Sequence, residues 1–122
     1  MTAYSPAAAA AAQDFTFPTS GSTDHVAFSE NGTTESSSIA RAAVGATGWS
    51  AATVANPSVK TNGSVITSPA ASGSGTITHF AVFSAASSGV QKTVWISLDE
   101  SKTVSPGDRL EFDTSELVIN LD

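Results

Sequence analysis

The chain has 122 residues and a formal net charge of −6 at pH 7, and only five of its residues are lysine or arginine. This length provides for one domain with a single core, and so few basic residues exclude a phosphate-binding surface, so we expect no nucleic-acid partner. The absence of cysteine excludes disulfides, thiolate metal sites and cysteine nucleophiles.

Serine, threonine and alanine dominate the composition. Serine and threonine compete with the helix backbone for hydrogen bonds, whereas threonine, valine and isoleucine suit half-buried strands, so an all-β fold is expected. No apolar run approaches the roughly 18 to 20 residues of a membrane span, and the chain does not begin like a signal peptide. We therefore expect a soluble protein that is made in the cytoplasm and has no membrane partner.

The first 23 residues are predicted to form an N-terminal arm. Ser5 can cap a helix and Pro6 suits its first position, so the alanines that follow predict a short helix, with a frayed tail as the alternative. An extended stretch then places Phe15 and Phe17 on the same side. We expect a chain without residues 1–20 to fold still but to attach less firmly to its partners.

Residues 24–122 read as one domain of short strands. Apolar and polar residues alternate between turn signals, at spacings of about 8 to 12 residues that are typical of a β-sandwich or jelly roll with about seven to nine strands. The predicted strand segments are His25–Glu30, Ile39–Trp49, Ala51–Thr61, Asn62–Thr67, Thr76–Ser84, Lys92–Leu98, Arg109–Asp113 and Leu117–Asp122. The expected fold is a single antiparallel, jelly-roll-like sandwich.

The segment Thr76–Ser84 carries apolar residues on both faces. Strict alternation places Ile77 and Phe83 on one face, and Phe80 and Val82 on the other. A strand that is half exposed should have one polar face, so both faces here need cover. We expect one face to pack inside the domain and the other to meet a neighbouring subunit.

Trp95 is a further apolar residue on a face that is expected to be polar. Alternation in Lys92–Leu98 turns Val94 and Ile96 inward and places the indole on the face that should contact solvent. Stacking on sugars is one use of such an aromatic face; we favour protein contact, because exposed apolar patches usually mark interfaces. The candidate residues of an interface with another subunit or a partner protein are Tyr4, Phe15, Phe17, Phe80, Val82 and Trp95.

The chemistry of an enzyme is not apparent in the sequence. A serine nucleophile needs a histidine oriented by a carboxylate, but His25 and His79 both lie within predicted strands and no G-x-S-x-G motif is present. Acidic residues crowd positions 108–116, yet Asp113 followed by Glu116 fits a capped turn better than a calcium loop. We expect no enzymatic activity, no metal and no cofactor.

Several motifs resemble a group of small bacteriophage virion proteins over residues 24 to 122. They are "DHVAFSENG", "ARAAV", "GWSAAT", "VANPSVKT", "THFAVFSAASSG" and "TVSPGDRLEFDTSELVINLD". The chain departs from the group after His25, where members often carry a Thr-x-x-Pro loop, and after Gly89, where members are usually rich in glycine and leucine. The resemblance implies an all-β fold and a structural role in the virion.

Members of this group are labelled as tail, tail-fibre, minor capsid or head-decoration proteins. We expect a capsid decoration protein on the outer surface of the head, with the major capsid protein and other copies of this chain as partners. A trimer is expected by analogy with shell symmetry. The alternative is a minor tail or tail-fibre component, which could bind host glycans through Trp95.

Overall fold

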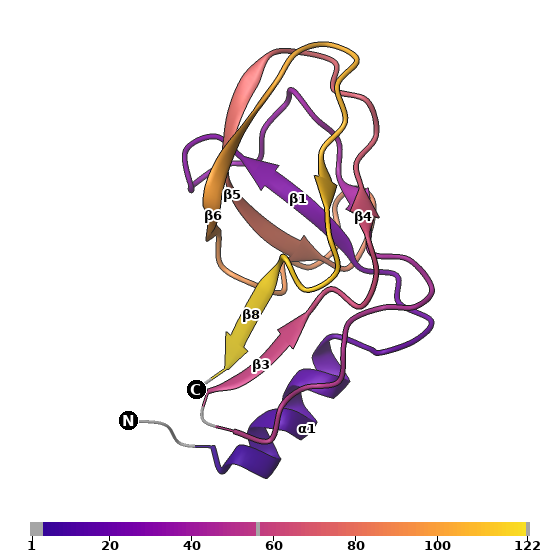
Figure 1. Cartoon of the computed structure of the whole chain (residues 1–122), viewed down its shortest axis with the longest axis vertical. Coiled ribbons are helices and arrows are strands. Elements are labelled where there is room, and N and C mark those ends of the chain that lie inside the picture. Colours follow the sequence, from indigo (N-terminus) through magenta and orange to yellow (C-terminus); the bar gives the residue numbers. More distant parts are fainter. Residues whose placement is uncertain (1–3, 56, 122) are drawn as a thin grey trace.

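The computed structural model describes residues 4–55 and 57–121, which form one helix and eight strands (Figure 1). Met1–Ala3 of the predicted arm, Asn56 and Asp122 lie outside the described residues. The elements are α1 (Pro6–Thr16), β1 (His25–Ser29), β2 (Ala42–Ala43), β3 (Ser58–Thr61), β4 (Ile66–Thr67), β5 (Gly75–Phe83), β6 (Ile96–Val104), β7 (Glu111–Phe112) and β8 (Val118–Leu121).

All strand pairs are antiparallel. Four strands form a sheet in the order β2-β1-β5-β6, while β3 pairs with β8 and β4 pairs with β7. The prediction of an all-β antiparallel fold is confirmed, whereas the jelly-roll arrangement stays a prediction. Within the described residues, no helix is long and apolar enough to cross a membrane.

One hydrophobic core lies between the four-stranded sheet and the two strand pairs. Phe28 of β1 stacks on Phe112 of β7, with ring centroids 5.8 Å apart. Ile66 of β4 and Ile119 of β8 belong to the same buried cluster. The two strand pairs thus cover one face of the sheet.

The two apolar faces predicted for β5 are explained by an irregularity in its pairing with β6. The register between the two strands shifts between Ile77 and His79. Such a bulge interrupts the strict alternation of side chains. Ile77 therefore joins Phe80 and Val82 in one core, and the prediction that they lie on opposite faces is wrong.

The other face of β5 is partly covered by this same chain. Ala81 lies opposite Ala27 of β1, and both are fully buried. The guanidinium carbon of Arg41 lies 3.8 Å from the centroid of the Phe83 ring, and Trp95 approaches that ring at 6.2 Å. These contacts within the chain cover part of this face and leave Phe83 and Trp95 half-buried, so the contact with a neighbouring subunit stays a prediction.

Helix α1 begins as predicted, since the hydroxyl of Ser5 accepts a hydrogen bond from the amide of Ala8 at 3.1 Å. It continues through Thr16, beyond the predicted alanine run. The prediction that Phe15 and Phe17 point the same way is wrong, because Phe15 is 89% exposed and Phe17 is 5% exposed. A helix of 11 residues is only marginally stable by itself in water. Its packing against the strands therefore stabilises it as far as Thr16.

Candidate functional site

The carboxyl end of α1 is held by a lysine that reaches it from β3. Lys60 is fully buried, and its Nζ lies 2.7 Å from Oδ1 of Asp14 and donates to the carbonyl of Phe17. The hydrogen bond from Lys60 holds the pKa of Asp14 below its ordinary value of 3.8, and the amide of Ala52 contributes in the same direction. A buried ammonium thus fixes the helix to the strands.

A second lysine meets the same end of the helix. Lys92 Nζ donates to the carbonyl of Thr16 at 2.7 Å and to Oδ1 of Asp24 at 2.6 Å. The other carboxylate oxygen of Asp24 accepts from the indole of Trp49 at 3.0 Å. Because α1 has no basic residue in its last turn, the two lysines supply the positive charge that favours a helix C-terminus.

Gln13 joins the buried face of α1 to the β3–β8 pair. Its amide nitrogen donates to the carbonyl of Ile119 at 3.1 Å, and its amide oxygen accepts from the hydroxyl of Ser58 at 2.8 Å. Gln13 is buried, so both bonds are shielded from water. The helix is therefore a fixed wall beside β8.

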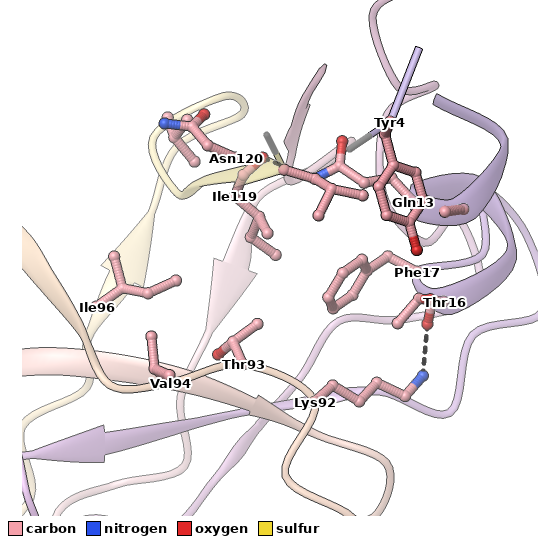
Figure 2. A pocket seen from close by; sticks show the side chains of 13 residues that line it. Tyr4, Gln13, Thr16, Phe17, Lys92, Thr93, Val94, Ile96, Ile119 and Asn120 are labelled. Carbon is pink, nitrogen blue, oxygen red and sulfur yellow. Dashed lines mark hydrogen bonds between the residues drawn. The ribbon is translucent and has the colours of Figure 1, made fainter. Parts of the chain in front are cut away.

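An open groove runs between α1, the segment 92–96 and β8 (Figure 2). Its volume is about 490 Å³. Figure 2 shows Phe17 and Ile119 extending into the space, with Ile96 and Val94 on the facing wall. This half of the groove is mainly apolar.

The groove continues along β8 into a second hollow of about 440 Å³ beside β6. The two hollows share Ile96, Val118 and Asn120 in their linings. Asp99, Glu100, Lys102 and Glu116 line the second half, and Lys102 forms an ion pair with Glu116 at 3.3 Å. We call the two hollows together the β6–β8 groove; it is apolar at one end and acidic at the other.

The predicted interface residues do not form one surface. Phe80 and Val82 are buried in the core, because the bulge in β5 turns both toward it; Phe80 nevertheless lines the second hollow of the β6–β8 groove, whereas Val82 does not line either hollow. Phe17 is also buried, although it and Tyr4 line the β6–β8 groove. The remaining two aromatics lie elsewhere, with Phe15 on the exposed side of α1 and Trp95 beside Phe83 on the opposite face of the sheet.

Two exposed valines at the groove were missed by the sequence analysis. Val94 was expected to face inward but is 77% exposed, and Val118 at the start of β8 is 39% exposed. The signal for Val118 was present, because Leu117 and Ile119 were assigned inward and alternation then turns Val118 outward. Val94 precedes β6, whose first residue is Ile96, so the alternation predicted for its segment does not hold there.

Both histidines have local partners. The ring nitrogens of His79 lie 2.8 Å from the hydroxyl of Thr78 and 3.2 Å from that of Ser97, while His25 contacts the carbonyl of Thr23. No cluster of three metal-ligating residues occurs in the described part of the chain. The expectations of no catalysis and no metal stay predictions.

The capped turn predicted for residues 113–116 is confirmed. The carboxylate of Glu116 accepts from the amide of Asp113 at 3.0 Å, and the amide of Glu116 donates to the Asp113 carbonyl at 3.0 Å. These carboxylates therefore stabilise a turn between β7 and β8.

A family model described as podophage GP4 fiber I protein gp80 matches residues 2–120. The matched range contains α1 in addition to the strands, so the likeness extends further toward the N-terminus than the motifs of residues 24 to 122 indicated. No curated protein matches the chain.

Proposed function

The chain belongs to the family of the podophage GP4 fiber I protein gp80 and is a small structural protein of a phage virion; from this premise we propose that it is a subunit of a virion fibre. The observation that carries the proposal is the extent of the match, which runs from residue 2 to residue 120. The matched range includes helix α1 and nearly all the residues that line the β6–β8 groove.

The internal contacts of the chain support a mechanical role. The helix is tied to the strands by buried side chains, and none of the buried side-chain polar atoms of the described residues lacks a hydrogen-bond partner. Completely satisfied polar networks make a fold rigid. A rigid domain is suited to transmitting force along a projecting structure.

The surface supports attachment to other proteins. Phe15, Val94 and Val118 are exposed, and the last two lie at the β6–β8 groove. Apolar groups that gather at a groove are typical of binding sites for other proteins. We assign the contacts of the chain within the virion to this side of the molecule.

Capsid decoration is the second candidate, with the major capsid protein and further copies of the chain as partners. The net charge of −6 favours it, because an acidic surface keeps densely arrayed copies soluble. In that role the chain would cover the outer surface of the head rather than project from the particle.

Copy number separates the two candidates. Quantitative mass spectrometry of purified particles gives the amount of this chain relative to the major capsid protein. A fibre subunit is expected in a small, fixed ratio to that protein. A ratio near one copy per major capsid subunit would contradict the fibre assignment and favour decoration, and absence from the particle would contradict both.

A further inference from the structure

Two strand edges border the β6–β8 groove. Among the described residues, β8 pairs only with β3, and β6 pairs only with β5. An unpaired edge presents N–H and C=O groups that can pair with another strand. The groove therefore lies between two edges that are both open to an incoming strand.

The hydrogen-bond pattern shows which groups of β8 point into the groove. Amides of the 50–53 segment donate to the carbonyls of Val59 and Thr61. The backbone N–H and C=O groups of these two residues of β3 therefore point away from β8. The residues opposite them are Asn120 and Val118. Two residues that face each other in an antiparallel ladder without exchanging hydrogen bonds both direct their backbone N–H and C=O groups away from the partner strand. Val118 and Asn120 thus offer their backbone groups to the groove that they line.

We propose that the β6–β8 groove binds an extended strand of a different virion protein, which pairs with the free edge of β8. This inference rests on the proposed structural role in a fibre. The incoming strand carries apolar side chains at alternate positions, which pack against Val94 and Ile96 at the apolar end. Strand addition of this kind draws its affinity from main-chain hydrogen bonds and its specificity from alternate side chains.

The acidic end of the groove sets the charge of the occupant. Lys102 neutralises Glu116, which leaves the exposed carboxylates of Asp99 and Glu100 to be complemented. A lysine or arginine at the corresponding end of the strand meets that need. The occupant is thus an extended segment that is apolar at one end and basic at the other.

This charge argument favours a different protein over a second copy of the chain. Four of the five lysine and arginine side chains form ion pairs within the chain, which leaves Arg109 as the one described lysine or arginine without a carboxylate partner, so a second copy offers little unpaired positive charge to the acidic end. The internal contacts are Arg41 with Glu35, Lys60 with Asp14, Lys92 with Asp24, Lys102 with Glu116, and Arg109 with the carbonyl of Ser68.

Photo-crosslinking in assembled virions tests the proposal. The photoreactive amino acid benzoylphenylalanine replaces Val94 at the groove or, as the control, Val54, which is also exposed but does not line the groove. Irradiation is expected to join position 94 to an extended, apolar and basic segment of one other virion protein. Position 54 should give no such adduct.

Three results would overturn the proposal: adducts only between copies of this chain, the same adduct from both positions, or no adduct from position 94. The presence of the chain in the particle is measured separately by mass spectrometry. Its absence would contradict the virion role itself, whereas its presence without the adduct would contradict only the binding of a strand in the groove.

A pair of variants at Val118 tests the backbone pairing. Val118→Pro removes an N–H that faces the groove and leaves the β3–β8 ladder intact, because proline is accepted at the first residue of a strand. Val118→Ala shortens the side chain and keeps the N–H. The adduct at position 94 should fall about tenfold with proline and less with alanine. Equal yields from the two variants would refute main-chain pairing at this edge.

Discussion

The ammonium of Lys60, fully buried in β3, lies 2.7 Å from the carboxylate of Asp14 on α1. The two residues are 46 positions apart, and their contact fixes the helix against the strands. Only the ammonium is buried, since the Asp14 side chain is 44% exposed, and removal of the carboxylate leaves this buried charge without its counter-ion. The attachment of the helix thus depends on this pair.

Asp14→Asn is expected to lower the free energy of unfolding by about 1 to 2 kcal/mol, because the buried ammonium of Lys60 keeps its charge and loses its carboxylate, while water screens part of the interaction at the exposed Asp14 side chain. Lys102→Gln is the control, since its pair with Glu116 is partly exposed and should contribute about 0 to 1 kcal/mol. Urea unfolding followed by tryptophan fluorescence measures both. Equal losses would show that burial of the Lys60 ammonium gives its ion pair no greater contribution to stability than the Lys102–Glu116 pair makes.

The same carboxylate makes the stability depend on pH. The pKa of Asp14 is lowered in the folded state, so its contribution is complete above its unfolded value of about 3.8 and is lost as the pH falls toward the folded pKa. The difference in unfolding free energy between the natural chain and Asp14→Asn should shrink below that pH. A difference that is constant from pH 6 to pH 3 would contradict the assigned shift.

Replacement by alanine is expected to reduce stability strongly at Phe17 and only slightly at Phe15. Phe17→Ala removes a ring from the core, where it meets Trp49 edge to face at 5.9 Å, and should cost about 3 to 5 kcal/mol. Phe15→Ala removes an exposed ring and should change stability by about 0.5 kcal/mol or less. Thermal unfolding compares the two variants. A large loss for Phe15→Ala would contradict the placement of α1.

Deletion of residues 1–20 is expected to abolish cooperative unfolding, which reverses the expectation drawn from the sequence. The deletion leaves Lys60 buried without Asp14 or the carbonyl of Phe17, and it exposes one side of Trp49. Circular dichroism during heating tests this. A truncated chain with a sharp transition near the original temperature would show that α1 is separable from the core.

The sequence predicted strands well where turns and alternation agree. His25–Glu30 corresponds to β1, and Leu117–Asp122 corresponds to β8 in its described part. The segment Ile39–Trp49 instead contains only a short strand, β2. Gly48 in that segment has a φ of +66°, and a Cβ there would lie 2.3 Å from the carbonyl oxygen of Pro18, so the chain turns where a strand was predicted.

Other features depend on contacts between distant segments. In β3 the polar Ser58 and Lys60 are buried while Val59 is only half buried, which inverts the usual pattern. The cause is α1, which supplies Gln13 and Asp14 as partners to these polar residues. Alternation within one strand contains no information about such partners. For the same reason the β6–β8 groove, whose lining comes from four separate segments, was not predicted.

Immunogold electron microscopy of purified virions with antibodies against this chain tests the fibre assignment most directly. The account predicts gold particles on structures that project from the virion. Gold distributed evenly over the surface of the head would contradict it and would identify the chain as a capsid decoration protein.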